Sequence, residues 1–175
     1  MVSMGLPVGE DSDESTKQFR EHFVGSLYRN KRLRGMTPHL SFNSIDRAGQ
    51  MHITVYGLKF ARLENPILDG SLDADATLST GERNFVLDHL EQNIGNEYRS
   101  MEHVARSIDD GIDSPEKLTH VLTDITPSNW TMTDSVAESM RNGIVSRMTE
   151  LDLIEPVRED EDITYKVTES GTDLL

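Results

Sequence analysis

The fold is indicated by one stretch near the C-terminus, which reads IVSRMTELDLIEP at residues 144–156 and ITYKVTESG at residues 163–171. Residues 133–150 read as a helix that Thr133 or Ser135 could cap. Residues 155–158 then read as a strand, the acidic run 159–162 as a turn, and residues 163–168 as the return strand. The apolar residues expected to face the core are Val136, Met140, Ile144, Val145 and Met148.

The closing phrase of this stretch occurs twice in the chain. ITVYGLKF at residues 53–60 matches VTESGTDL at residues 167–174. In both copies an apolar residue precedes Thr, Gly lies three residues after the Thr, and a large apolar residue lies three residues further on. The repetition predicts two related units.

The first copy is also preceded by helix-like and hairpin-like sequence. Residues 14–34 read as a helix with Phe19, Phe23 and Leu27 on one stripe, ended by Gly35. Residues 39–45 and 51–55 alternate with period two around turn residues 46–50, which predicts a hairpin. A short helix is expected after Gly57, up to Leu63. Two helices that would normally lie further upstream are missing from this unit.

Three helices are expected between the two copies. The first is capped by Ser79 or Thr80, with Glu82 in its first turn, and ends at Gly95. The second runs from Tyr98 to Ile108, and the third begins at Ser114 with Pro115 at its first position. The apolar residues expected inside are Phe85, Val86, Leu90, Ile94, Met101, Val104, Ala105, Ile108, Leu118, Val121, Leu122 and Ile125.

Residues 144–171 resemble the winged helix of MarR/ArsR-type prokaryotic transcriptional regulators. In that pattern a Ser-Arg run ends the recognition helix, Glu-Leu-x-Leu-Ile leads into the wing, and hydrophobic-Thr-x-x-Gly begins the last helix. Asp152 stands where the family usually has Gly, and the wing tip is acidic. The resemblance implies a helix that enters the major groove of DNA and a wing that reaches the flanking backbone.

The expected fold is therefore α+β and mainly helical. Residues 79–175 would form a complete winged helix, with a three-helix core and a β-hairpin wing, and residues 15–63 a partial second winged-helix unit. Residues 64–78 read as a linker and residues 1–14 as a disordered tail.

Composition limits the class of protein. The 175 residues carry a net charge of -14, with no Cys and a hydrophobic fraction of 35%. The absence of Cys excludes disulfides, thiolate zinc sites and thiol nucleophiles. The sequence shows neither a membrane-spanning run nor a secretory signal, so a cytoplasmic protein is expected. The acidic surplus is typical of a halophile cytoplasm, where salt shortens the Debye length to about 3 Å at 1 M.

Charge is distributed unevenly. From Ser15 to Leu63 the chain has nine Lys and Arg against two acids, a net +7. The cluster Arg29, Lys31, Arg32 and Arg34 indicates phosphate contacts. Alternatively, these cations complement a helix C-terminus or pair with acids of the other unit. The second group of candidate DNA-contacting residues is Arg141, Asn142, Ser146, Arg147 and Arg158.

The predicted function is sequence-specific binding of double-stranded DNA in transcriptional regulation, by a homodimer on a two-fold operator. The alternative is a winged-helix module that binds a partner protein and not DNA, because a fold does not fix a function. An enzyme, a metal site, a cofactor and a membrane association are not expected. The pair His120 and Asp124 reads as a surface pair. The sequence leaves a small-molecule effector open.

Overall fold

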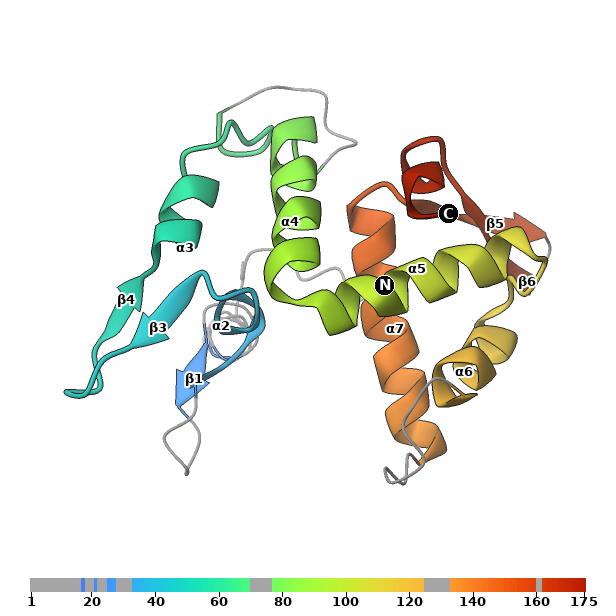
Figure 1. The fold of residues 1–175 in the computed structure, drawn as a ribbon, viewed down its shortest axis with the longest axis horizontal. Helices are drawn as coiled ribbons and strands as arrows, with labels where there is room; N and C mark the ends of the chain where they lie inside the picture. Colours follow the sequence, from blue (N-terminus) through green and yellow to red (C-terminus); the bar gives the residue numbers. More distant parts are fainter. Residues whose placement is uncertain are drawn as a thin grey trace, which may run out of the picture. The chain divides into compact units, whose positions relative to one another are not determined.

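The structure, a computed structural model, describes residues 17, 21, 25–27, 33–69, 77–124, 133–159 and 162–175. The chain divides into two compact units, Met1–Glu64 and Asn65–Leu175, and each is described by itself. The fold is α+β and mainly helical (Figure 1). Within the described residues its strands form three separate antiparallel hairpins, each of two strands.

The N-terminal unit consists of short elements. Strand β1 (Ser26–Leu27) pairs with β2 (Leu33–Arg34), and β3 (Asn43–Ile45) pairs with β4 (Met51–Ile53). The described residues of this unit also form two short helices: α2 (Met36–His39) precedes β3, and α3 (Val55–Phe60) follows β4.

The helix predicted over residues 14–34 is wrong in its second half, where β1 and β2 form instead. Gly25 has a φ of 120° and Gly35 a φ of 136°, backbone conformations that no α-helix contains. A side chain at Gly25 would also meet Pro38, because an added Cβ would lie 2.9 Å from its Cγ. The predicted tail 1–14 lies outside the described residues.

The second hairpin was predicted too long at both ends. His39 belongs to α2, and the strand begins only at Asn43. Strand β4 ends at Ile53 because Thr54 is already the N-cap of α3. As a result α3 (Val55–Phe60) starts before Gly57, whereas the helix was predicted to start after it.

The core of the N-terminal unit is small. Leu40 and Phe42 are buried, and the ring of Phe42 stacks on Phe60 with 5.0 Å between centroids. On β4, Met51 and Ile53 remain 42% and 58% exposed. The hairpin of this unit therefore has an apolar face that the described residues only partly cover.

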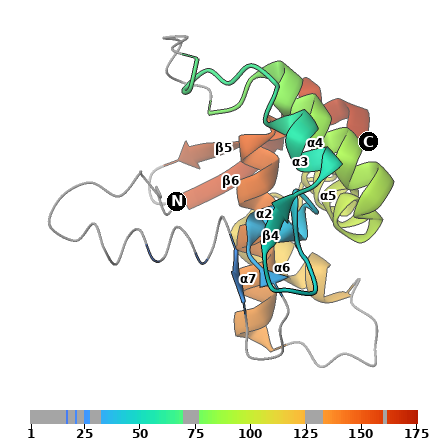
Figure 2. The same cartoon turned by 90° about the vertical axis from the view of Figure 1, so that its left-hand side faces the viewer.

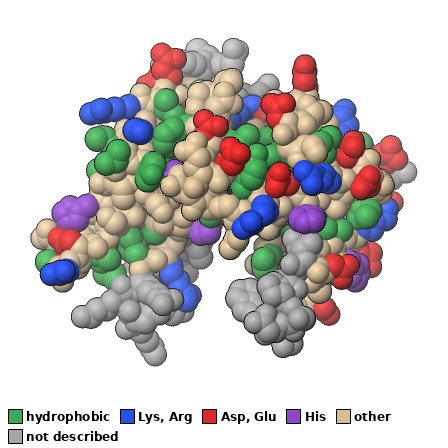
Figure 3. All heavy atoms as spheres, in the orientation of Figure 1, with side chains coloured by type: hydrophobic (Ala, Val, Ile, Leu, Met, Phe, Trp, Pro, Cys, Tyr) green, Lys and Arg blue, Asp and Glu red, His purple; other side chains and the backbone are tan. Residues whose placement is uncertain are grey.

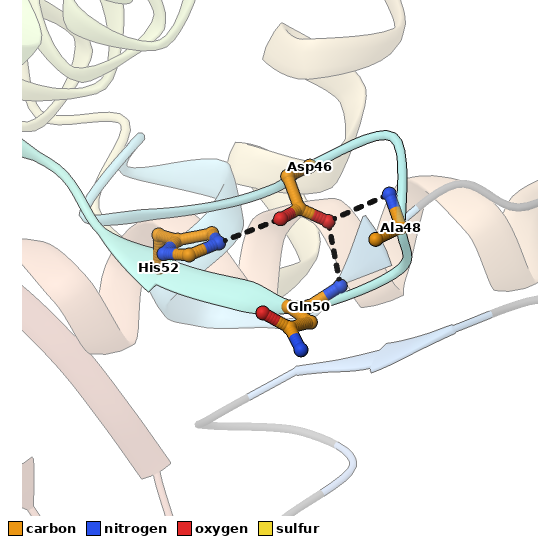
Figure 4. A network of polar contacts seen from close by, with 4 residues as sticks. All are labelled: Asp46, Ala48, Gln50 and His52. Carbon is orange, nitrogen blue, oxygen red and sulfur yellow. Dashed lines mark hydrogen bonds and ion pairs between the residues drawn. The ribbon is translucent and has the colours of Figure 1, made fainter.

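The turn of this hairpin is built around Asp46 (Figure 4). Its carboxylate accepts hydrogen bonds from the backbone N–H groups of Ala48 (2.8 Å) and Gln50 (2.9 Å), and from Nε2 of His52 (2.9 Å). The bond from His52 is the main cause that lowers the pKa of Asp46, followed by the backbone bond from Gln50. The turn predicted at residues 46–50 is confirmed.

The C-terminal unit contains four helices, one hairpin and a short 3-10 helix in its described residues. In chain order these are α4 (Thr80–Asn93), α5 (Gly95–Asp109), α6 (Pro115–Asp124), α7 (Asp134–Glu150), β5 (Ile154–Glu159), β6 (Asp162–Val167) and η2 (Ser170–Leu174). Figure 1 shows α5 crossing α7, and Figure 2 shows β5 and β6 leaving the end of α7 as an extended arm.

The start of α4 confirms the predicted cap. Ser79 Oγ accepts from the Glu82 backbone N–H at 3.1 Å, while the Glu82 carboxylate accepts from the Ser79 N–H at 2.8 Å. Glu82 is buried, and Asn65 Nδ2 donates to both of its carboxylate oxygens. Residue Ile94 alone separates α4 from α5, so α5 begins at Gly95 and not at the predicted Tyr98.

All four helices and β5 contribute to the core of this unit. The largest fully buried side chains are Leu90, Val104, Met101, Leu118, Leu122, Met148 and Ile154. The predicted inner residues of α5 are confirmed as buried. On α7, however, the prediction that Val136 and Met140 face the core is wrong, because they are 47% and 38% exposed. Ala137 is buried in their place, which shifts the inner stripe by one residue.

The hairpin of the C-terminal unit is attached to the helices along one strand. Strands β5 and β6 pair from Ile154 with Val167 to Glu159 with Asp162. The backbone N–H of Tyr165 on β6 donates to the carbonyl of Asp113, in the loop between α5 and α6, at 3.0 Å.

Among the helices in the described ranges, none is long and apolar enough to cross a membrane.

Candidate nucleic-acid interface

The repeated phrase closes both units with the same hydrogen bonds. In the C-terminal unit, Thr168 Oγ1 donates to the carbonyl of Asp152 and accepts from the N–H of Gly171 at 3.1 Å. Its backbone N–H donates to the carbonyl of Leu153 at 3.1 Å. Thr168 therefore joins the end of the hairpin to the residues that precede its first strand.

Thr54 makes the corresponding bonds in the N-terminal unit. Its Oγ1 donates to the carbonyl of Ser41 at 2.6 Å and accepts from the N–H of Gly57 at 3.1 Å. Its N–H donates to the carbonyl of Phe42 at 2.9 Å. The repeated phrase in the sequence therefore corresponds to the same set of hydrogen bonds in both units.

The helix that enters each hairpin ends in the same way. In α2 the N–H of Phe42 donates to the carbonyl of Thr37 at 2.7 Å, and in α7 the N–H of Leu153 donates to Met148 at 2.8 Å. Ser41 and Asp152 take the left-handed conformation between them, with φ of 56° and 62°. This is the Schellman ending, in which Gly usually takes the left-handed position.

Asp152, where the sequence departs from the expected Gly, has a compensating partner. Its carboxylate forms an ion pair with Nη1 of Arg83 on α4 at 2.8 Å. A non-glycine residue in the left-handed region costs roughly 1 kcal/mol. The contact with Arg83 offsets part of that cost and links α4 to the turn between α7 and β5.

One face of α7 is turned to solvent. Ala137, Ile144, Val145 and Met148 form its buried stripe. With 3.6 residues per turn, the opposite side carries a second stripe, called here the outer stripe. All six of its residues are exposed: Ser135, Val136, Ser139, Asn142, Gly143 and Ser146.

Exposed Glu138 lies at the edge of the outer stripe and exposed Glu150 extends its line beyond Ser146, but the six residues of the stripe carry no charge. This is unexpected on the surface of a chain with 31 acids and 17 Lys and Arg. Two of the predicted DNA-contacting residues, Asn142 and Ser146, lie on it. The sequence-based reasoning missed Ser135, Ser139 and Gly143, and it assigned Val136 to the core. A buried stripe centred on Ala137 would have revealed all four.

Arg141 and Arg147 lie elsewhere on α7. Arg141 is half-buried in line with Ala137 and Ile144, and its Nε is enclosed without a hydrogen bond to the described residues. Arg147 forms an ion pair with Glu97 of α5, and the two side chains are 19% and 15% exposed. Arg147 therefore links α7 to α5. Its charge is compensated by Glu97, so it does not belong to the candidate interface.

The remaining predicted cations belong to strands or to undescribed segments. Arg158 is exposed on β5 of the C-terminal unit. Arg34 is exposed on β2 of the N-terminal unit. Arg29, Lys31 and Arg32 lie outside the described residues. Of the predicted contact residues that the structure describes, Asn142 and Ser146 share the outer stripe of α7.

Most cations of the C-terminal unit are paired with acids. Residues 65–175 contain eight Lys and Arg, and five of them form ion pairs. The pairs are Arg83–Asp152, Arg106–Glu102, Lys117–Asp113, Arg147–Glu97 and Lys166–Glu155. Figure 3 shows acidic side chains spread among the basic ones on the face in view. With 24 Asp and Glu against these eight cations, residues 65–175 carry a net charge of -16 and repel a polyanion at long range in dilute salt.

Glu150, one turn beyond Ser146, gives a pH-dependent prediction. Burial raises its pKa, and Arg147 lowers it by a smaller amount. The ionised form is therefore less stable in the folded chain than in the unfolded chain, and this cost is complete above the folded pKa. Glu150→Gln should stabilise the fold at pH 7, by less than about 1 kcal/mol because the carboxyl remains partly hydrated.

The stabilisation by Glu150→Gln should shrink as the pH falls through the raised folded pKa. It should vanish below the ordinary Glu value of about 4.3, where both states are protonated. Melting temperatures of the two proteins in concentrated KCl at pH 7 and at about pH 3, well below the ordinary Glu pKa of about 4.3, measure this. If the difference in melting temperature between Glu150→Gln and the unaltered protein is the same at both pH values, Glu150 is not desolvated. The same conclusion follows if the variant is less stable at pH 7.

In the described ranges, no group of three or more His, Cys, Asp or Glu side chains is arranged so that it could hold a metal ion.

No family model matches the chain, and neither curated proteins nor solved structures yield a match.

Proposed function

We propose that the C-terminal unit is a winged helix of the kind found in transcriptional regulators, with α7 as its recognition helix and β5–β6 as its wing. The order of elements supports this, because α5, α6 and α7 precede the hairpin. So does the bond from Tyr165 to Asp113, which ties the wing to the loop between the first two of these helices. In this proposal α7 binds in the major groove of double-stranded DNA.

The observation that carries the proposal is the uncharged outer stripe of α7. A major groove about 12 Å wide admits one α-helix, and acids on the inserted face would be repelled by the phosphates. From Ser135 to Ser146 the stripe contains no acid in a protein of net charge -14, and the exposed acids nearest to it on α7 are Glu138 at its edge and Glu150 at its C-terminal end. Asn142 and the stripe serines offer donors and acceptors for base edges and phosphates.

Phosphate contacts would come from cations outside the stripe. In the C-terminal unit the candidate is Arg158 on the wing strand β5. In the N-terminal unit the candidates are Arg29, Lys31, Arg32 and Arg34. Two copies on a two-fold operator would double these contacts. Concentrated salt, which shortens the Debye length to about 3 Å at 1 M, would keep the acidic surface from repelling DNA at a distance.

A second function is favoured by a different observation. In the N-terminal unit, Val55 and Leu58 on α3 are 70% and 42% exposed, next to Ile53 on β4. Exposed apolar clusters mark protein-binding surfaces. The chain could accordingly act as a winged-helix module that binds a partner protein and makes no DNA contact.

Binding of labelled duplex DNA in a KCl series separates the two functions. The full-length chain should bind a pool of random duplexes, and Asn142→Asp should weaken this binding by about 5- to 100-fold, the range for one lost base contact. Gln92→Glu places the same added charge on an exposed position of α4 and should leave binding unchanged. If the unaltered protein does not bind DNA at any salt concentration, the DNA-binding proposal is wrong.

A further inference from the structure

The outer stripe of α7 also limits which bases can be read, if the proposed DNA binding holds. Guanine is most often recognised by Arg or Lys, which donate two hydrogen bonds to its O6 and N7. The outer stripe contains neither residue. Arg141 lies on the opposite side of α7, and Arg147 is paired with Glu97. The usual means of reading guanine is therefore absent from this surface.

Two residues of the stripe match the chemistry of an A·T pair. The amide of Asn142 can accept from adenine N6 and donate to adenine N7, a pairing that no other base offers in the major groove. The methyl groups of Val136, which is 47% exposed, can pack on the 5-methyl group of thymine. Both side chains are exposed, so neither fills a space in the core of the unit.

The spacing of these residues fits neighbouring base pairs. Six positions separate Val136 from Asn142, which is about 9 Å along a helix axis at 1.5 Å per residue. Successive base pairs are about 3.4 Å apart. The two side chains therefore reach base pairs two to three steps apart, with Ser139 between them.

Gly143 allows the helix backbone to approach the DNA closely. A Cβ added to this residue would meet no atom within 4 Å, so the packing of the protein does not require glycine here. Glycine inside a helix costs roughly 1 kcal/mol relative to alanine. A position that is open, exposed and occupied by glycine is suited to close contact with a ligand.

We propose that the outer stripe of α7 recognises A·T base pairs, with adenine bound by Asn142 and a thymine methyl group bound by Val136 two to three base pairs away. This inference rests on the proposed function and names its substrate class. It predicts a half-site whose essential positions are A·T pairs, with no guanine contact from α7.

Selection from a pool of random duplexes, followed by base substitution in the selected sequence, tests this. The selected half-site should contain the two A·T positions. Replacing its adenine by 7-deazaadenine should lower affinity about 5- to 100-fold for the unaltered protein and have little effect on Asn142→Ala. Replacing its thymine by uracil removes the methyl group alone and should weaken the unaltered protein several-fold, but not Val136→Ala.

The outcomes are distinguishable. Gln92→Ala on α4 is the matched control and should respond to both analogues as the unaltered protein does. Selection of essential G·C pairs, or equal sensitivity of Asn142→Ala and the unaltered protein to 7-deazaadenine, would overturn the A·T assignment and leave DNA binding intact. Absence of any selected or retained DNA would overturn the proposed function itself.

Discussion

Replacing Gly171 by Ala is expected to destabilise the C-terminal unit by about 3 kcal/mol or more, near the upper end for single substitutions. A Cβ at this residue would lie 1.9 Å from the carbonyl oxygen of Leu153 and 2.8 Å from its carbonyl carbon. The same oxygen accepts the backbone bond from Thr168 that closes the hairpin. The added methyl group must therefore separate the end of the β5–β6 hairpin from its beginning.

Denaturation of the purified protein in concentrated KCl, followed by circular dichroism, measures this loss. Gly143→Ala is the matched control, because its added Cβ would meet nothing within 4 Å, and it should stabilise α7 by about 0.5–1 kcal/mol. The N-terminal unit should respond in parallel to Gly57→Ala, whose Cβ would lie 2.1 Å from the carbonyl oxygen of Phe42. Equal stability of Gly171→Ala and Gly143→Ala would contradict the described contact.

Removing either member of the Arg147–Glu97 ion pair is expected to cost about 2–3 kcal/mol, somewhat less than a fully buried pair because both side chains keep slight exposure. Arg147→Ala removes the guanidinium that compensates the Glu97 carboxylate between α5 and α7, and Glu97→Ala removes the carboxylate that compensates Arg147. The double variant should therefore be little worse than either single variant.

A double-mutant cycle on unfolding free energies gives the coupling between these two residues. The comparison pair is Arg106 and Glu102 on the surface of α5, 3.8 Å apart, for which the coupling should be below about 0.5 kcal/mol. If Arg147 and Glu97 couple no more strongly than Arg106 and Glu102, then Arg147 is available to DNA. The interface would then have to include it.

Local signals in the sequence predicted much of the fold. Ser79 and Glu82 are in the arrangement of a capping box, and their reciprocal hydrogen bonds are present. The Thr-x-x-Gly phrase predicted two related closures, and Thr54 and Thr168 make matching bonds. These features depend on residues within a few positions of one another, so their spacing is visible in the chain itself.

Some features that depend on packing between distant residues were predicted wrongly. The phase of α7 was misassigned because Val136 and Met140 are apolar, whereas small Ala137 occupies the inner position. Arg147 was taken for a DNA contact because its partner, Glu97, lies fifty residues earlier. Strands β1 and β2 were hidden in a helical pattern that the backbone of Gly25 interrupts.

The central claim is that the outer stripe of α7 contacts DNA, and site-specific cross-linking tests it most directly. The chain has no Cys, so Ser139→Cys gives a single thiol on the stripe for a photoactivated cross-linker, and Gln92→Cys gives one on α4. We expect irradiation with the selected duplex in concentrated KCl to join DNA to residue 139 and not to residue 92. Equal cross-linking at both positions, or none at residue 139 while DNA is bound, would contradict the claim.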